Sequence, residues 1–411
     1  MLWTHPERPG RGVRLAYCLN LHAAEDLAGT LAGLRAITLP LRERLGAGDG
    51  FGVGMYIPAA LAQRLAAPDG ARELAQLSAV LAGEGLDPFT YNAFPYGGFH
   101  ARGLKRGVFT PTWLEARRLE FTLAVAEVAR ALETRAERVS ISTHPGRFGP
   151  WEEGEAERAL AGFRRAAAGL RAIEERGGPR VVLALEAEPR ASAGDTRALA
   201  QWLSLARAEG DGAYLGACLD CCHSAVEFED PGEAFDLATR GGAPLGKLQF
   251  SSAPALARPG GDEAARAQLL GMDEAVYLHQ VTGRRGAELL RVADLSDLAA
   301  ALAGDEAPAW LACDEWRCHF HVPVDLEALA GGALGTTRAH ADGVLDAALA
   351  APERWGGDEL QVEIETYTWD VLPGPARGPG GLVDGLEREY RHVMGRLSAA
   401  GWRPANGPGR R

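Results

Sequence analysis

Short apolar runs alternate with longer amphipathic stretches along most of the chain. Runs that are apolar on both faces are typical of strands buried inside a parallel sheet. The sequence predicts eight such strands, at 14–22, 51–57, 88–95, 138–144, 180–188, 214–219, 244–252 and 360–369. Most segments between these strands carry apolar residues at helical spacing and are predicted helices. The predicted helices lie at 25–45, 58–81, 112–132, 151–175, 335–349 and 382–397, and a further one begins at Asp195. The helix at 58–81 is broken at 68–70.

Eight strand–helix units of this kind predict an α/β fold, a (β/α)8 TIM barrel. An open, doubly wound sheet is the alternative, but no Gly-x-Gly-x-x-Gly pattern follows the first strand. The alternation breaks at 273–323, where strands at 275–282 and 288–293 flank the segment 283–286 and an extended segment, 310–321, follows. We therefore expect one domain, 1–400, with a β-hairpin insertion at 273–323 between strands seven and eight, and a tail at 401–411.

Polar residues gather at the predicted strand ends, where barrels of this type carry their chemistry. They are His22, Asn92, His144, Glu186, Glu188, Asp220, His223, Lys247, Gln249, Glu363 and Glu365, with His319 and His321 just before the last strand. Most of the ten histidines of the chain lie at or near these ends. The pattern predicts an active or binding site at the mouth of the barrel.

Asp220 and His223 are three residues apart just past the sixth strand, so both side chains can face the same mouth. A carboxylate and an imidazole are ligands that zinc, manganese and iron accept. The alternative is that Asp220 caps the next helix and His223 is an ordinary loop histidine. His319 and His321 lie on one side of an extended segment, so both imidazoles could bind the same metal ion. The alternative is that they are two solvent-exposed loop histidines with no shared role.

Charge favours the metal interpretation. Glu186, Asp220 and Glu365 would converge in a mostly apolar mouth, where they would repel one another and lose hydration. Lys247 alone would not balance them, whereas a divalent cation would. The mixed oxygen and nitrogen donors predict one or two ions of zinc, manganese or iron rather than calcium.

The other polar residues have candidate roles in catalysis and substrate binding. Alternate side chains of a strand point inward, so Glu188 and Glu363 can face the mouth and transfer protons. The alternative is that they are buried hydrogen-bond partners of metal-binding residues, or helix caps. Lys247 and Arg317 could hold a carboxylate or phosphate of a substrate. The remaining candidate substrate-binding residues are His22, Asn92 and Trp316.

Bulk properties narrow the classes of partner. The formal net charge of −12 argues against a nucleic-acid partner held by phosphate contacts. No apolar run approaches the length of a membrane span, and residues 1–14 lack the apolar core of a secretory signal, so we expect a cytoplasmic protein. The six cysteines are expected to be small buried packing residues, although Cys218-x-x-Cys221 has zinc-ribbon or redox spacing.

These residues resemble the xylose isomerase-like barrel superfamily, and locally its endonuclease IV members. The shared motifs are His144-Pro-Gly146, Glu186, Leu219-Asp-Cys-Cys-His223 and Glu365-Thr366. Gln249 stands where endonuclease IV has a metal-binding histidine, and His319-Phe-His321 where it has Asp-x-His. Its strand-three histidine is absent, with Asn92 nearby. The resemblance implies metal ligation by Glu186, Asp220, His223, His319, His321 and Glu365, with His144 and Gln249 at two further ligand positions, and one or two ions rather than three.

Over nearly its whole length the chain is more similar to EboE-type metabolite traffic proteins of that superfamily. The supporting segments are 17–22, 92–100, 140–143, 222–230, 249–252, 277–280 and 315–323. This resemblance implies a cytoplasmic barrel encoded with a small biosynthetic or export cluster, and it allows a membrane-associated partner from that cluster. The reaction of the family is poorly defined, so the resemblance indicates the fold better than the chemistry.

Three functions are compatible with these observations. The first is a metal-dependent isomerase or epimerase acting on a sugar or a similar hydroxy-carbonyl compound. The second is a metal-dependent phosphodiesterase related to endonuclease IV, which the acidic charge and the missing histidine disfavour. The third is a non-catalytic barrel that binds or hands over a hydrophobic metabolite. Aromatic residues expected near the mouth suit the third, or else pack the insertion onto the barrel: Phe94, Tyr96, Phe99, Trp316, Tyr367 and Trp369.

Overall fold

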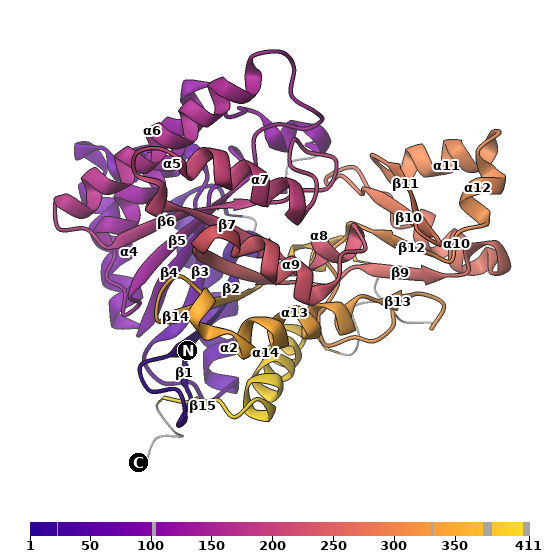
Figure 1. Cartoon of the computed structure of the whole chain (residues 1–411). Helices are drawn as coiled ribbons and strands as arrows, with labels where there is room; N and C mark the ends of the chain where they lie inside the picture. Colours follow the sequence, from indigo (N-terminus) through magenta and orange to yellow (C-terminus); the bar gives the residue numbers. More distant parts are fainter. Residues whose placement is uncertain (23, 101–103, 330–331, 373–379, 406–411) are drawn as a thin grey trace.

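Eight parallel strands pair in chain order and close on themselves in the computed structural model, which describes residues 1–22, 24–100, 104–329, 332–372 and 380–405 (Figure 1). The strands are β2 (Gly12–Cys18), β3 (Phe51–Tyr56), β4 (Leu86–Asn92), β5 (Arg138–Thr143), β6 (Arg180–Glu186), β7 (Leu215–Asp220), β8 (Leu245–Phe250) and β14 (Glu359–Ile364). β14 pairs with both β8 and β2, so the sheet has no free edge there. The predicted (β/α)8 barrel is confirmed.

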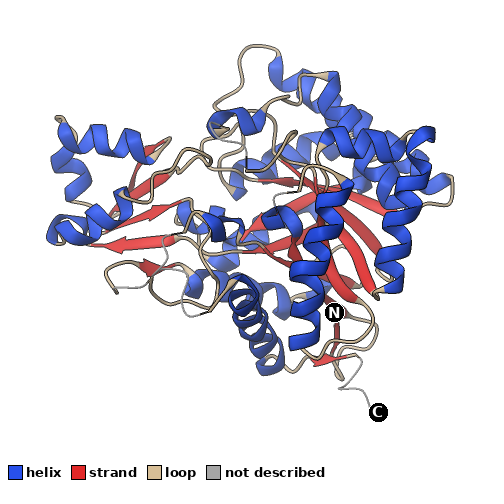
Figure 2. Cartoon of the chain, turned by 180° about the vertical axis from the view of Figure 1, so that it is seen from behind, coloured by secondary structure: helices blue, strands red, loops and turns tan. Residues whose placement is uncertain are grey.

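Helices cover the outside of this barrel (Figure 2). They are α1 (Leu27–Gly33), α2 (Leu39–Arg44), α3 (Ala59–Ala66), α4 (Ala71–Gly83), α5 (Ala116–Ala131), α6 (Glu155–Glu175), α7 (Thr196–Arg207), α8 (Cys221–Val226), α9 (Pro231–Ala238), α13 (Arg338–Ala350) and α14 (Leu382–Ala399). A π-helical stretch, Leu34–Thr38, joins α1 to α2. As expected, Asp195 caps α7, because its side chain accepts a hydrogen bond from the backbone N–H of Ala198.

The apolar runs of the sequence become the barrel core because each strand is covered on both faces. All residues of β2, β3, β4, β5, β7 and β8 are buried. β1 (Leu2–Thr4) pairs antiparallel with the start of β2, and β15 (Arg403–Pro404), from the other end of the chain, pairs antiparallel with β1. The predicted tail, 401–411, therefore begins with a strand, and its residues 406–411 lie outside the described residues.

A second sheet projects from the barrel between β8 and β14, at the right of Figure 1. Its order is β11 (Glu288–Val292), β10 (Val281–Arg285), β12 (Glu315–Cys318), β9 (Pro254–Ala257) and β13 (Gly335–Thr336), and α10 (Glu263–Leu270), α11 (Leu295–Ala303) and α12 (Ala307–Leu311) pack on it. We call this unit the inserted sheet. Its strands extend beyond 273–323 on both sides, and a separate apolar core forms inside it around Trp310 and Trp316.

The predicted hairpin forms between β10 and β11, but its turn lies further along the chain than expected. Gly283 pairs with Leu290 and Arg285 with Glu288, so the chain turns at Gly286 and Ala287. Gly286 has φ +58°, a left-handed conformation that glycine adopts without a Cβ clash. Gly283 is instead a strand residue that lies against Trp310 and Cys313.

Within the described residues, none of the helices combines the length and apolarity that a membrane crossing requires.

Candidate functional site

Three carboxylates from separate strands meet at the C-terminal mouth of the barrel. Glu186 ends β6, Asp220 ends β7, and Glu365 directly follows β14. One oxygen from each lies within 4.8 Å of the others, and all three side chains are buried. Parallel barrel strands end at the same rim, which is why residues far apart in sequence converge here.

Hydrogen bonds fix two of these carboxylates while free oxygens remain. Asp220 Oδ1 accepts from the His223 backbone N–H at 2.9 Å and from Ser251 Oγ at 2.8 Å. Asp220 Oδ2 and Glu186 Oε2 are buried with no hydrogen-bond partner. Glu365 Oε2 accepts from the Gln249 amide at 2.5 Å. Buried carboxylate oxygens without donors are costly, so the arrangement favours a bound cation.

Three histidines surround the carboxylates, and each uses Nδ1 for a hydrogen bond to a carbonyl oxygen. His223 Nδ1 lies 2.9 Å from Ala187 O, His319 Nδ1 lies 2.7 Å from Gln280 Oε1, and His321 Nδ1 lies 2.8 Å from Glu365 O. Because carbonyl oxygens only accept, Nδ1 carries the proton in each ring. Whenever such a ring is neutral, its Nε2 presents a lone pair toward the cluster, as in metal-binding histidines.

The Nε2 atoms lie where a positive charge would stabilise them. His223 Nε2 and His319 Nε2 are 3.0 Å apart, and His321 Nε2 is buried without a partner. Two lone pairs at that distance repel unless a proton or a metal ion lies between them. Each of the trios Glu188–His223–His319 and Asp220–His223–His321 brings its ligand atoms within 4.8 Å of one another.

Burial also decides the ionisation of the acids. Burial, reinforced by Glu365 and Asp220, raises the pKa of Glu186 well above its ordinary value. Burial, reinforced by Asp220 and Glu363, does the same to the pKa of Glu365. Lys247 opposes both shifts but does not cancel them. A divalent cation would keep these acids ionised, and the mixed oxygen and nitrogen donors fit zinc, manganese or iron.

A cavity opens above this cluster, with an empty volume of about 580 Å³ that includes the space open to solvent. Its lining contains Asn92, Glu186, Glu188, His223, Gln249, His319, His321 and Glu365, all of them predicted site residues. The inserted sheet supplies His319 and His321, which follow β12, and Gln280, which precedes β10. The insertion is therefore part of the site, since two of its three histidines come from it.

Lys247 and Glu363, predicted to be catalytic, form a fully buried ion pair of 2.5 Å that does not line the cavity. Lys247 Nζ is also 3.3 Å from Tyr91 O, and Glu363 packs against Gly54 of β3. The pair thus spans the barrel interior. Both strand positions point inward as expected, but they lie deeper in the barrel than the Gln249 and Glu365 positions that follow them.

Other predicted residues lie away from the cavity. Trp316 is fully buried in the core of the inserted sheet, where its indole N–H donates to Trp310 O, so it presents no surface to a substrate. Arg317 donates to Glu315 and to Ala225 O and stacks on Phe228. Its guanidinium is occupied by these contacts and is not among the cavity-lining groups.

His22 and His144 are buried beside the site rather than in it. His22 Nε2 bonds to Tyr17 OH at 2.9 Å, and its ring packs against Gly33 of α1. His144 packs on Phe94, with Nδ1 accepting from the Gly146 N–H and Nε2 unpartnered. Neither shares a ligand group with the clustered acids among the described residues. Of the predicted aromatic residues, Phe94, Phe99 and Tyr367 line the cavity, whereas Tyr96 packs on Phe121 and Trp369 on Gly385.

Asn20 and Gln280 belong to the site but were not singled out by sequence reasoning, and the contacts of Asn92 and Tyr367 were not predicted in detail. Asn20 donates to Glu365 Oε1 at 2.9 Å, and Asn92 to the same oxygen at 3.2 Å. Gln280 orients His319, and Tyr367 OH lies 3.5 Å from His319 Nε2. Asn20 has the same signal as the predicted residues, a polar side chain just after a strand. Gln280 carries no such signal, because it reaches the site through the fold of the insertion.

No protein-family model matches the sequence, and a search of curated proteins finds no match. Solved structures do match. The IOLI protein with a binding zinc atom is 12% identical, with a TM-score of 0.46 over 94% of this chain and 99% of that chain. D-Psicose 3-epimerase with D-tagatose from Clostridium cellulolyticum H10 is 11% identical, with a TM-score of 0.47 over 94% and 99%. A xylose isomerase domain protein from Planctomyces limnophilus is 12% identical, with a TM-score of 0.46 over 88% and 93%. The barrel assignment rests on strand order, and the EboE-type resemblance stays a prediction.

Proposed function

We propose that this protein is a metal-dependent isomerase or epimerase acting on a sugar or a similar hydroxy-carbonyl compound. One observation carries the proposal: the buried acids Glu186, Asp220 and Glu365 converge from three strands with unpartnered oxygens on the first two. The same mouth holds three imidazoles whose Nδ1 atoms are committed elsewhere. This is a donor set for a divalent ion at the base of a small-molecule cavity.

Glu186, Asp220 and Glu365 would hold the ion, together with His223, His319 or His321. The ion would supply Lewis-acid polarisation of neighbouring oxygens on a bound substrate. Gln249 supports Glu365 rather than offering a free ligand atom, because its carbonyl oxygen accepts from Cys218 Sγ at 2.5 Å. We assign Gln249, Asn20 and Asn92 the task of orienting Glu365.

Proton transfer falls to Glu188 among the predicted catalytic residues. It lines the cavity, and its Oε2 is buried without a hydrogen-bond partner. A carboxylate held there can take a proton from one substrate carbon and deliver it to the neighbouring carbon, as an isomerisation requires. Lys247 and Glu363 neutralise each other inside the barrel, so we assign them a positioning role below the reacting groups.

A non-catalytic metabolite-binding barrel is the second candidate, and the apolar upper wall of the cavity favours it. Phe94, Phe99, Val108 and Phe109 all line the space above the acids. A carrier would use the same cavity and metal without turnover. Cytoplasmic location and a membrane-associated partner from the same gene cluster are part of this proposal.

Elemental analysis of protein purified without chelators tests the metal site directly. The wild type is expected to retain about one or two zinc, manganese or iron ions per chain, and Asp220→Ala is expected to lose most of that metal. Glu389→Gln is the matched control, because Glu389 is an equally buried acid outside the cluster.

Metal-free wild-type protein that also takes up none of these ions on titration would contradict the proposal. Equal metal content in wild type and Asp220→Ala would contradict the assigned ligand. Metal-loaded protein that binds hydroxy-carbonyl compounds but does not interconvert them would favour the carrier over the enzyme.

A further inference from the structure

The cavity has two chemically different ends. The acids, imidazoles and amides lie together at the barrel mouth. The rest of the lining is formed mainly by apolar and aromatic side chains, among them Phe94, Phe99, Val108, Phe109, Val276 and Tyr277. A ligand that fills the cavity must therefore be polar at one end and apolar along most of its length.

Two segments from distant parts of the chain build this apolar wall. Phe94, Phe99 and Phe109 come from the connection between β4 and α5, and Val276 and Tyr277 from the inserted sheet. The Phe94 and Phe109 rings are 5.3 Å apart, and Phe99 lies 5.7 Å from Tyr277. Each pair packs edge-on or tilted, and Phe99 and Tyr277 both also pack on Tyr367, so these three rings form one apolar surface.

The polar groups within this wall are already committed. Lys105 is the one lysine or arginine that lines the cavity among the described residues, and its Nζ pairs with Asp273 at 3.1 Å and Asp294 at 2.8 Å. The Lys105 backbone N–H donates to Val276 O at 3.0 Å, which ties the two wall segments together. Tyr277 OH bonds to His100 Nδ1 at 2.6 Å. Among the residues that the structure describes, the wall thus offers no unpaired cation to a phosphate or carboxylate.

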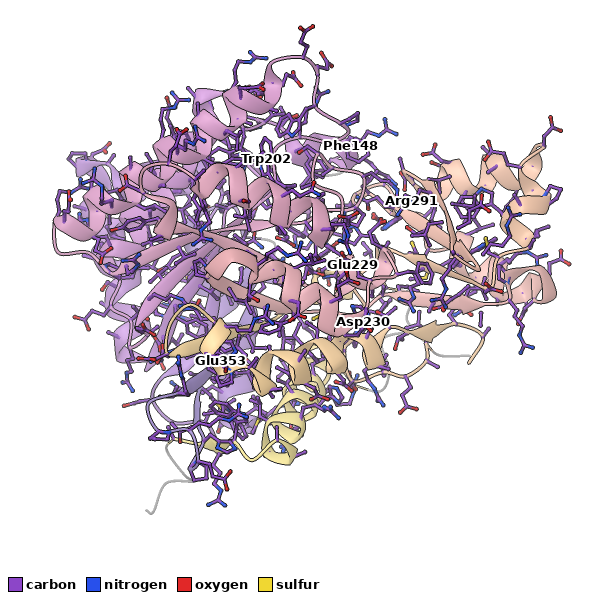
Figure 3. All side chains as sticks on the ribbon, in the orientation of Figure 1. Phe148, Trp202, Glu229, Asp230, Arg291 and Glu353 are labelled. Carbon is purple, nitrogen blue, oxygen red and sulfur yellow. The ribbon has the colours of Figure 1, made fainter. Side chains whose placement is uncertain are left out.

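Inserted-sheet contacts keep the wall over the mouth. Arg190 donates to Val292 O and to Val281 O, and it pairs with Glu227 of the barrel side. Arg291 of β11, labelled in Figure 3, donates to the other oxygen of Glu227 at 2.9 Å. These contacts hold the inserted sheet against the barrel, so its part of the apolar wall belongs to the folded structure of the site.

We infer that the substrate of this site carries its adjacent oxygens at one end of a large apolar, preferably aromatic, body, and is not a free sugar or a sugar phosphate. The inference rests on the proposed metal-dependent function and names the substrate class for it. A sugar placed here would press several hydroxyl groups against a wall that cannot pair with them, which is costly. An aromatic body would instead remove the wall from water at a gain proportional to its area.

Paired probes separate the polar head from the apolar body. Acetohydroxamate and benzohydroxamate present the same two adjacent oxygens to a metal and differ in a methyl or a phenyl group. Isothermal titration calorimetry with the metal-containing wild type is expected to show benzohydroxamate binding at least about tenfold more tightly, since the phenyl ring buries apolar area that the methyl group lacks. D-Fructose, a hydroxy-carbonyl sugar, is expected to bind more weakly than benzohydroxamate.

Variants of the wall locate the effect. Val108→Asn and Val276→Asn change half-buried positions, so both proteins are expected to fold. Each variant should weaken the binding of benzohydroxamate by about fivefold or more and leave the binding of acetohydroxamate unchanged. The reason is that the new amide would be buried against the phenyl ring, whereas it does not contact the two oxygens that bind the metal. Leu205→Asn is the matched control, since Leu205 on α7 is 53% exposed and is not among the lining residues, and it should alter the binding of neither probe.

The results of these binding experiments test the apolar substrate class separately from the proposed metal-dependent function. Equal affinity for the two hydroxamates, or tighter binding of D-fructose, would overturn the apolar substrate class and leave the metal site standing. Binding of neither hydroxamate to protein shown to contain metal would contradict the proposed site itself. Wall variants that weaken both probes equally would place the aromatic body elsewhere, and so would also overturn the inference.

Discussion

At the scale of single residues, the orientation of each imidazole decides whether it can serve as a ligand. His319 Nδ1 bonds to Gln280 Oε1 at 2.7 Å, so Nε2 is left facing His223. We predict that Gln280→Leu lowers metal affinity by about 10- to 100-fold, because the ring loses the acceptor that fixes its tautomer. Competition against a fluorescent chelator measures this change.

Gln280→Glu keeps an acceptor at the same position and should retain most of the affinity. Gln63→Leu, a change at an exposed glutamine on α3, should have no effect. Unchanged affinity in Gln280→Leu would show that His319 is not held for metal binding. A loss in both Gln280 variants would point to disturbed packing of the insertion instead.

A second residue-scale prediction concerns Glu389, whose pKa burial raises from 4.5 to about 8. Between these values the folded protein keeps a proton that the unfolded chain has released, so stability falls as pH rises across the window. For one group the slope reaches about 1.4 kcal/mol per pH unit. Glu389→Gln should therefore gain stability relative to wild type from pH 5 to pH 8, as measured by urea unfolding.

Glu387→Gln provides the comparison on the same helix, because Glu387 pairs with Arg391 nearer the surface. Its difference from wild type should not drift across the window in the same direction. A constant difference between Glu389→Gln and wild type would mean that Glu389 is ionised in the fold. The hydrogen bonds from Val324 N–H and Thr366 Oγ1 would then outweigh its burial.

At the scale of elements, Arg190 fastens the inserted sheet to the barrel. Its guanidinium donates to Val281 O at 2.7 Å and Val292 O at 3.1 Å and pairs with Glu227, while its backbone has φ +67°. We predict that Arg190→Ala speeds amide hydrogen exchange in β10 and β11 by about tenfold or more, because two strand carbonyls lose their donor and Glu227 keeps only Arg291 as an ionic partner. Strands β3 and β4 should exchange as before.

Arg285→Ala is the matched control for this prediction, since Arg285 forms an exposed pair with Glu288 inside the hairpin. Surface pairs of that kind contribute little, so exchange should barely change. Uniform acceleration over the whole chain in Arg190→Ala would indicate global destabilisation. Unchanged exchange in β10 and β11 would show that other contacts hold the insertion.

Element by element, the sequence predicts the barrel well because both faces of each strand are buried. The resulting apolar runs stand out and end close to the observed strands, and the residue after each run marks the mouth. The inserted sheet is harder, because β9 and β13 pair across about eighty intervening residues. Trp316 was therefore expected near a substrate, whereas nonlocal pairing places it in a separate core.

At the scale of the whole molecule, the sequence does not predict how deep each inward-pointing side chain lies along the barrel axis. Period-two alternation shows that Glu363 and Glu365 both point inward, but not which layer meets the substrate. Glu365 lines the cavity, whereas Glu363 is paired one layer below it. Depth depends on the register of all eight strands, and Glu363 aligns with Gln249 on one side and Ala16 on the other.

This depth gives the final prediction, because the Lys247–Glu363 pair is fully buried between strands that close the barrel. Lys247→Met leaves the Glu363 carboxylate buried without its partner and should cost roughly 3–5 kcal/mol of unfolding free energy. Glu363→Gln should also destabilise by leaving Lys247 charged. The double variant should be more stable than the sum of the two losses implies, since no lone charge remains. Chemical denaturation of the four proteins at pH 7 measures this coupling. Additive losses would mean that the two side chains act independently, and that Lys247 serves the acids at the mouth instead.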